Sequence, residues 1–299
     1  IFIFEKVTMI TFPNIQPEIF SITIGSFELA LRWYALSYIL GFMCALYLMK
    51  RFILRENLWP EDQAPMSVYH ANGLLTYLIV GVIVGGRLGY VIFYNLDYYL
   101  SDPLSIIRVW DGGMAFHGGF IGVVLAVLLY SKVNQLQLWS VSDLIAISTP
   151  PGLFFGRVAN FVNAELWGRP TNMPWGVVFP GDRAQDCELV VGICARHPSQ
   201  LYEAVLEGLV LFCLLIYTGS KGAFRQPGLI TAFFAIGYGF SRFFVEYFRV
   251  PDPQFFSTSN PFGFAFQIGD VGITMGQALS LPMIIAGLTL IVLSKVKNY

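Results

Sequence analysis

The stretch Gly73-Leu74-Leu75-Thr76-Tyr77-Leu78-Ile79-Val80-Gly81-Val82-Ile83-Val84-Gly85-Gly86-Arg87-Leu88-Gly89-Tyr90-Val91-Ile92-Phe93-Tyr94 decides the fold class. A helix needs about 20 apolar residues to cross a bilayer, and this stretch provides them with a single charged side chain, Arg87. A surface helix of a soluble protein would carry a polar face instead. The stretch therefore predicts a transmembrane helix.

The composition extends this prediction to the whole chain. Of 299 residues, 56% are hydrophobic and 12% charged, and the mean hydropathy is +0.63. Soluble domains contain about 25% charged residues, so this chain has too few to cover a globular surface. We expect an all-α, polytopic transmembrane bundle. The net charge of −1 gives no electrostatic basis for binding nucleic acid.

Hydropathy predicts about seven membrane spans. They cover residues 29–49, 73–94, 114–130, 141–162, 200–218, 228–247 and 275–293. The fourth and fifth are the least uniform, because polar residues interrupt their ends. No internal repeat is evident, so residues 1–299 are expected to form a single membrane domain.

Basic residues orient the chain. Every lysine except Lys6 lies in the segments after the first, third and fifth spans or in the C-terminal tail. The positive-inside rule then predicts an outside N-terminus and a cytoplasmic C-terminus. The longest outer segment, 164–199, is rich in Pro, Gly and Trp and is expected to form a small extracytoplasmic cap. It holds Cys187 and Cys194, for which a disulfide and free thiols both stay open.

Ionisable residues inside the predicted spans are costly and usually functional. They are Arg87, His117, Arg157, Glu203, Glu207, Arg242 and Glu246. Because arginines and glutamates balance in number, a purely structural ion-pair network is the alternative to a functional site.

Helical geometry groups several polar residues into two stripes. In the fourth span, Gly156, Asn160 and Asn163 share a face that Arg157 borders; in the sixth, Tyr238, Arg242 and Arg249 share a face beside Glu246. Guanidinium groups bind phosphate oxygens in a bidentate manner. Two such stripes around one cavity predict a site for a phosphate-bearing lipid.

The segment Gly156-Arg157-Val158-Ala159-Asn160-Phe161-Val162-Asn163-Ala164-Glu165-Leu166-Trp167-Gly168 resembles the signature of bacterial prolipoprotein diacylglyceryl transferases. Other stretches agree with this resemblance: 32–34, 85–90, 110–119, 196–203 and 242–249. The similarity covers nearly the whole chain from about Met9, where chains of this family usually begin. The origin of residues 1–8 stays open.

The resemblance implies a reaction and its partners. A diacylglyceryl group moves from phosphatidylglycerol to the lipobox cysteine thiol of a prolipoprotein, a thioether forms, and glycerol phosphate leaves. This is the first step of bacterial lipoprotein maturation, at the outer leaflet of the cytoplasmic (inner) membrane. Besides these two substrates the implied partner is the bilayer, and neither a cofactor nor a metal is expected.

Four residues are predicted to be catalytic: His117, Arg157, Arg242 and Tyr34. The two arginines would grip the lipid phosphate, since fixed guanidinium groups stabilise the charge that builds on the leaving group. His117 would accept the thiol proton. Tyr34 would orient the headgroup or the thiolate. Alternatively, His117 bonds the backbone at a helix start, and Tyr34 only anchors the membrane interface.

The remaining site residues are predicted to bind substrate or shape the site. Asn160, Asn163 and Glu165 would hold Arg157, and Gly168 would allow a tight turn into the cap. Arg249 would guide the substrate or headgroup. Arg87 would bind substrate, with a structural pairing to a glutamate of another span as the alternative.

Two histidines are assigned structural places: His197 is expected to cap the fifth span, and His70 to lie near the cytoplasmic end of the second.

Two other classes of membrane protein fit the sequence less well. A secondary transporter would show related halves with helices broken at matching positions, and no such symmetry is evident. An aspartyl intramembrane protease would need two aspartates inside spans. Here Asp143 stands at a span edge, and Gln267-Ile268-Gly269-Asp270 lacks the required glycine.

Overall fold

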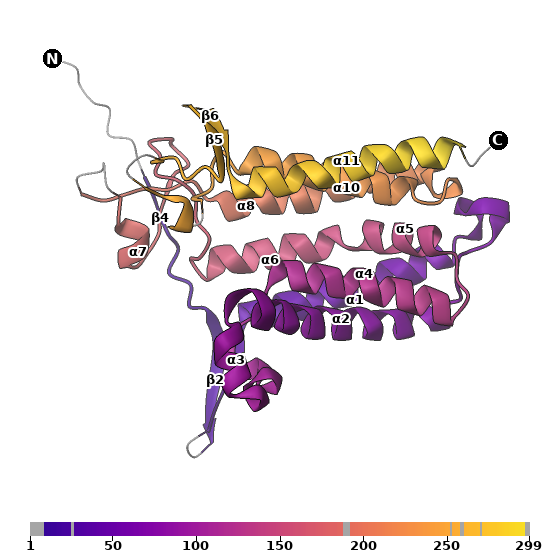
Figure 1. The fold of residues 1–299 in the computed structure, drawn as a ribbon, viewed down its shortest axis with the longest axis horizontal. Helices are drawn as coiled ribbons and strands as arrows, with labels where there is room; N and C mark the ends of the chain where they lie inside the picture. Colours follow the sequence, from indigo (N-terminus) through magenta and orange to yellow (C-terminus); the bar gives the residue numbers. More distant parts are fainter. Residues whose placement is uncertain are drawn as a thin grey trace.

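The computed structural model describes residues 9–24, 27–187, 192–251, 253–257, 260–269 and 271–296, so residues 1–8 lie outside it. Its long helices run side by side as a bundle (Figure 1), which confirms the predicted fold class. They are α1 (Trp33–Ile53), α2 (Val68–Tyr94), α4 (Phe116–Val133), α5 (Leu138–Ser148), α6 (Pro150–Val162), the continuous segment α8 (Ser199–Glu203), η5 (Ala204–Val210) and α9 (Leu211–Ser220), α10 (Leu229–Val245) and α11 (Met275–Val296).

These helices make the chain an integral membrane protein. Five described helical segments are long and apolar enough to cross a bilayer, starting at residues 33, 68, 116, 199 and 275, and α10 is a shorter apolar helix. Each of the seven predicted spans coincides with one helix, with two helices, or, for the fifth, with the continuous α8–η5–α9 segment. The number of crossings and the division into a single domain stay predictions.

The fourth predicted span is divided at Thr149 into α5 and α6. Pro150 and Pro151 have no N–H with which to continue the α5 ladder, so the first proline begins a new helix. The Thr149 hydroxyl donates to the carbonyl of Ile145 at 2.8 Å, which satisfies one carbonyl near the end of α5. The helix that begins after this break, α6, carries Arg157.

The first predicted span starts too early. Residues 29–32 belong to β3 (Phe27–Arg32), which pairs antiparallel with β2 (Glu18–Ile24), and α1 begins only at Trp33. Hydropathy could not distinguish the end of β3 from the start of α1, because both segments are rich in apolar residues.

Glycines bring the helices into close contact. A Cβ on Gly85 of α2 would collide with the carbonyl oxygen of Gly118 in α4, and one on Gly89 would lie 2.7 Å from the Gly118 Cα. Small residues thus let the backbones of α2 and α4 approach each other closely. Gly41 of α1 faces Gly152 of α6 less tightly, where a Cβ on Gly41 would lie 3.1 Å from the Gly152 Cα, and α11 packs along α10.

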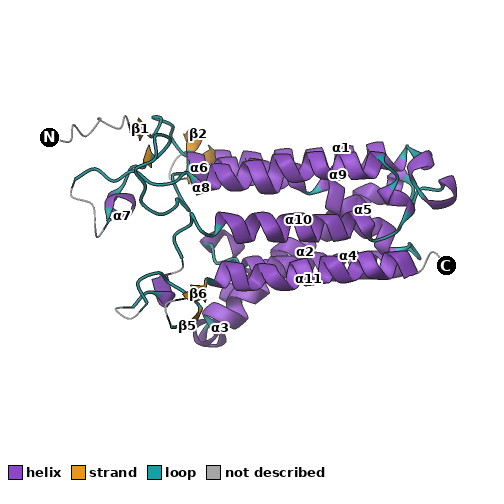
Figure 2. Cartoon of the chain, turned by 90° about the horizontal axis from the view of Figure 1, so that it is seen from above, coloured by secondary structure: helices purple, strands orange, loops and turns teal. Residues whose placement is uncertain are grey.

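Strands and irregular segments gather at one end of the bundle (Figures 1 and 2). This end holds the β2–β3 hairpin, the β5 (Phe266–Ile268) and β6 (Val271–Ile273) hairpin, and β1 (Ile10–Thr11) paired parallel with β4 (Val177–Val178). It also holds α3 (Leu96–Ser101) and α7 (Asp182–Gln185).

The segment 164–199 forms much of this end. It is largely irregular and has its own small apolar cluster, in which Val177, Phe179 and Ala184 pack with Phe12 and Phe161. The structure pairs Cys187 with Cys194 in a disulfide, which decides between the two possibilities left by the sequence.

Candidate functional site

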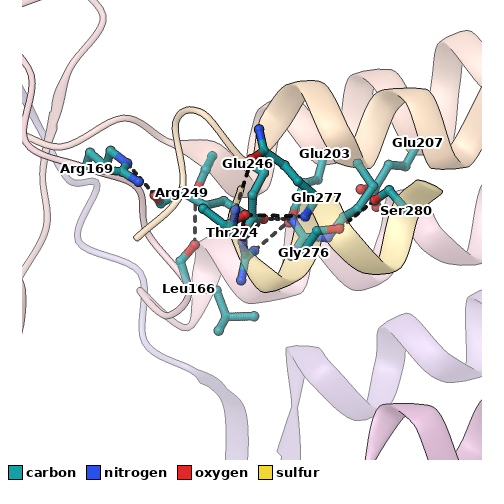
Figure 3. A network of polar contacts seen from close by, with 12 residues as sticks. Leu166, Arg169, Glu203, Glu207, Glu246, Arg249, Thr274, Gly276, Gln277 and Ser280 are labelled. Carbon is teal, nitrogen blue, oxygen red and sulfur yellow. Dashed lines mark hydrogen bonds and ion pairs between the residues drawn. The ribbon is translucent and has the colours of Figure 1, made fainter. Parts of the chain in front are cut away.

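Three arginines and three glutamates form one buried cluster where α6, α8, η5 and the end of α10 meet. Arg157 comes from α6, and Arg242 from α10. Arg249 lies beyond α10, which ends at Val245, so its predicted place on a helical stripe is wrong. The 246–248 turn nevertheless returns Arg249 to the cluster, where it lies beside Glu246 and Glu203 (Figure 3).

Glu203 is the centre of this cluster. Its Oε2 lies 3.2 Å from Arg157 Nη1, and its Oε1 lies 3.2 Å from Arg242 Nη1 and 2.8 Å from Arg249 Nη1. A single carboxylate therefore fixes the relative positions of all three guanidinium groups.

The other two glutamates complete the cluster. Glu207 Oε2 lies 3.2 Å from Arg157 Nη2. Glu246 Oε2 lies 2.7 Å from Arg242 Nη1 and 3.7 Å from Arg249 Nε. Formal charges balance at three of each sign, which is what allows so many ionised groups to be buried together.

The two kinds of residue differ in exposure. The side chains of Arg157, Arg242 and Arg249 are 19%, 20% and 15% exposed, whereas those of Glu203 and Glu207 are fully buried. A guanidinium has five N–H donors, and the carboxylate contacts of Arg242 all use Nη1. The buried glutamates thus hold the arginines, and the Nε and Nη2 donors of Arg242 have no hydrogen-bond partner among the described residues.

The end of the α6 motif is held by side-chain amides. Asn160 Nδ2 donates to Glu165 Oε1 at 2.8 Å, and Asn163 Nδ2 to the same oxygen at 3.4 Å. The two asparagines thus hold Glu165 rather than Arg157, which corrects part of the predicted arrangement. Gln200 Nε2 donates to the Glu165 carbonyl at 2.5 Å and ties this loop to α8.

The turn after α6 is made by Ala164 and Leu166, with φ of 52° and 58°, and not by Gly168. Gly168 is needed for a close approach instead. A Cβ there would collide with the Phe248 carbonyl oxygen and lie 2.8 Å from the His197 carbonyl oxygen. The predicted tight turn at Gly168 is therefore wrong. Non-glycine residues held at positive φ often mark functional sites.

Tyr34 lies in the first turn of α1, which packs along α6. Its hydroxyl is 3.4 Å from that of Tyr38, and it lies within electrostatic range of Glu165 and Arg157. Tyr34 is an exposed residue, at 38%. The structure therefore brings Tyr34 near the arginine side of the site.

His117 lies on a different pair of helices. It is an exposed residue in the first turn of α4, which packs on α2 and α5. Its ring meets that of Phe116, and among the described residues it has no side-chain hydrogen bond. The alternative of a histidine bonding the backbone at the helix start is thus not observed.

Arg87 is 4% exposed and does not join the cluster. Its guanidinium donates to the carbonyls of Ser105, Ile106 and Arg108, at 2.7, 2.8 and 3.0 Å, and also to Gly112 and Gly113. The alternative of a pairing with a glutamate is therefore wrong. Arg87 holds the connection between α3 and α4 in place.

His197 does not cap α8, contrary to prediction, since no side chain among the described residues caps that helix. Its Nδ1 lies 3.0 Å from the Tyr202 hydroxyl, which also accepts from Trp175 Nε1 at 2.8 Å. Burial lowers the pKa of His197 below its ordinary value. His70 forms a capping box with Ser67 at the start of α2, in agreement with a structural place.

The three glutamates stand out in the sequence as charged residues inside spans, but none of them is among the predicted site residues. The signal was present: Glu203 and Glu207 are four residues apart in an apolar segment that contains no arginine. Which arginine each would meet depends on helix packing, to which the π-helical η5 contributes by changing the helical phase.

Comparison with known proteins gives a consistent answer. The family model described as "Prolipoprotein diacylglyceryl transferase" matches residues 18–293. The phosphatidylglycerol–prolipoprotein diacylglyceryl transferase of Roseobacter denitrificans is 56% identical over 283 residues, covering 94% of this chain and 96% of that protein. Enzymes of the same name from Ruegeria pomeroyi and Rhizobium meliloti are 55% and 43% identical, over 94% and 95% of this chain and 95% and 93% of their own length.

Proposed function

Since the chain belongs to the prolipoprotein diacylglyceryl transferase family, we propose that its arginine–glutamate cluster is where phosphatidylglycerol is bound and cleaved. The chain is a phosphatidylglycerol–prolipoprotein diacylglyceryl transferase, an enzyme of lipoprotein biosynthesis. A carbon–sulfur bond forms between the acceptor thiol and the diacylglyceryl carbon. The bond from that carbon to the phosphate oxygen breaks, and glycerol phosphate leaves with the electron pair.

The observation that carries this proposal is the arrangement of Arg157 and Arg242. Each is held by two buried carboxylates, and each keeps N–H donors that those carboxylates do not use. Fixed donors of this kind stabilise charge as it develops on a leaving phosphate, at about 3–4 kcal/mol per contact in a dry site. Arg249, which shares the Glu203 carboxylate with them, guides the headgroup.

The same contacts also agree with a purely structural ion-pair network. A structural network, however, has no need of partly exposed guanidinium groups above fully buried glutamates. A phosphate clamp formed by Arg157 and Arg242 needs partly exposed guanidinium groups, since their N–H donors must reach the lipid phosphate. The two interpretations differ in their prediction for an arginine substitution: a phosphate clamp would lose lipid binding, whereas a structural network would lose stability.

The acceptor thiol must lose its proton to react, because the thiolate is the nucleophile. We assign this proton to His117, whose exposed ring has no side-chain hydrogen bond among the described residues. Tyr34 orients the headgroup or the thiolate, supported by its proximity to Arg157 and Glu165. Asn160, Asn163, Glu165 and Gly168 shape the substrate-binding loop.

We place Arg87 indirectly in substrate binding, since it holds the 105–113 segment that leads into His117. We further propose that the enzyme lies in the bacterial cytoplasmic membrane, with the N-terminus outside and the C-terminus in the cytoplasm. The end that holds segment 164–199 and its disulfide would then face the oxidising side. Reporter fusions at both ends test this orientation, and a cytoplasmic N-terminus would contradict it.

The function is tested with purified full-length protein, labelled phosphatidylglycerol and a lipobox peptide. Label is expected on the peptide, with release of one glycerol phosphate per thioether. A matched peptide with serine in place of the cysteine is the control and should stay unlabelled. Labelling of the serine peptide, or release of glycerol phosphate without a peptide acceptor, would overturn the thiol transfer.

A further inference from the structure

The first turn of α11 lies against the carboxylate of Glu246 (Figure 3). Thr274, which directly precedes α11, donates its hydroxyl to Glu246 Oε1 at 3.1 Å. Both residues are buried, with exposures of 3% and 5%.

The hydrogen bonds of Thr274 fix the direction in which its hydroxyl points. Its Oγ1 accepts from the Gln277 N–H at 3.3 Å, and its own N–H donates to Gln277 Oε1 at 3.1 Å. This reciprocal pair is a capping box, which anchors the start of a helix. The Gln277 N–H donates to a lone pair of the Thr274 hydroxyl and does not use its hydrogen. The single hydrogen of that hydroxyl is therefore donated to Glu246.

Gly276 leaves the space that the carboxylate occupies. A Cβ at this position would lie 2.5 Å from Glu246 Cδ and 2.6 Å from Glu246 Oε2. Any side chain here would therefore displace the carboxylate. The start of a helix also carries partial positive charge, which favours a carboxylate at this place.

The opposite side of Glu246 faces the arginines. Its Oε2 lies 2.7 Å from Arg242 Nη1 and 3.7 Å from Arg249 Nε. The carboxylate is thus held between α11 on one side and two guanidinium groups on the other. A shift of Glu246 would move Arg242, and with it the donors that point out of the cluster.

We propose that Thr274 and Gly276 are positioning residues for phosphatidylglycerol, acting through Glu246 on Arg242 and Arg249. This inference rests on the proposed function of the cluster. It makes α11 part of the lipid-binding site, although α11 contributes no charged residue to the cluster itself.

The test compares pairs of variants of the full-length enzyme in the transfer assay. Thr274→Val keeps the shape and removes the hydroxyl, while Thr274→Ser keeps the hydroxyl. Because displacements of about 1 Å cost up to about 100-fold in rate, Thr274→Val and Gly276→Ala are expected to lower kcat/KM for phosphatidylglycerol about 10- to 100-fold. Thr274→Ser should restore it to within about threefold, and KM for the peptide should be unchanged.

Gly287→Ala is the matched control. It lies in the same helix and interface, where a Cβ would come within 2.6 Å of Ile236 and 2.8 Å of the Ala232 carbonyl oxygen. It should lower thermal stability but leave kcat/KM for phosphatidylglycerol of the folded enzyme unchanged. An equal loss in Gly287→Ala, or equal values for Thr274→Val and Thr274→Ser, would overturn the inference.

Arg242→Ala separates this inference from the proposed function. If Arg242→Ala loses phosphatidylglycerol binding while Thr274→Val and Gly276→Ala keep it, the positioning inference fails and the clamp stands. If Arg242→Ala itself binds the lipid normally, the clamp fails, and the inference fails with it.

Discussion

Glu203 Oε2 lies 3.2 Å from Arg157 Nη1, and the glutamate side chain is fully buried while the arginine is 19% exposed. Because of this difference in exposure, the carboxylate can contact only other protein groups, whereas the guanidinium can also bind a ligand. The same carboxylate also contacts Arg242 and Arg249, so a change at Glu203 reaches every cation of the cluster.

Glu203→Gln tests the central position of this carboxylate. The amide has the same shape but carries no charge, and its NH2 group would face a guanidinium. Losing one partner of a buried ion pair costs about 3–5 kcal/mol, so a clear fall in thermal stability is expected together with at least about 100-fold lower transfer. Unfolding curves and transfer rates check this, and wild-type values for both would show that Glu203 is not central.

The pH dependence of stability should reveal His197. Burial lowers its pKa, so the folded protein resists a proton that the unfolded chain accepts near the ordinary value of 6.5. Stability from this residue is therefore present above that pH and is lost as the pH falls below it. His197→Gln keeps a polar group beside Tyr202 but does not titrate. Melting temperatures should fall less in this variant than in wild type between about pH 7.5 and 5.5; parallel curves would contradict the prediction.

The disulfide between Cys187 and Cys194 closes a short loop beside Arg196. Arg196 donates to the Ala184 and Asp186 carbonyls at 2.5 and 2.7 Å and lies over the Trp167 ring, so this loop is joined to the end of the α6 motif. Loop closure is worth about 2–3 kcal/mol in the chain-entropy account.

The double variant Cys187→Ser/Cys194→Ser should therefore unfold at lower temperature than wild type. Reductant should bring wild type to the value of the variant and leave the variant itself unchanged. A reductant effect of equal size on both proteins would contradict a stabilising disulfide.

His117→Gln tests the assignment of the thiol proton. The variant is expected to bind phosphatidylglycerol normally and to transfer slowly at neutral pH, since removal of a general base costs about 100-fold or more. Transfer rates across pH, with lipid binding measured in parallel, check this. If activity persists with an unchanged pH profile, the proton acceptor is Tyr34 or water, and the transferase assignment is unaffected.

Much of the fold follows from hydropathy, because bilayer-spanning helices need long apolar runs. The exceptions have local causes: Pro150 divides the fourth span, and residues 29–32 are as apolar in a strand as they would be in a helix. The contacts of Arg249 with Glu203 and Glu246 could not be predicted from a helical wheel, because α10 ends at Val245, before Arg249.

The site was predicted in part. Periodicity pointed to Arg157 and Arg242, since both are charged residues inside apolar helices. It could not show that Glu203 joins them, or that Glu246 is held by Thr274, because those contacts join segments far apart in the sequence. The pattern Thr274-Met275-Gly276-Gln277 does mark a helix start, but not the carboxylate that it receives.

Lipid binding by Arg157→Ala and Arg242→Ala, measured together with transfer to the lipobox peptide, tests the central claim most directly. Both variants are expected to fold, to lose turnover, and to bind phosphatidylglycerol far more weakly than wild type. Near-wild-type transfer by either folded variant would contradict the phosphate clamp and leave the cluster as a structural network.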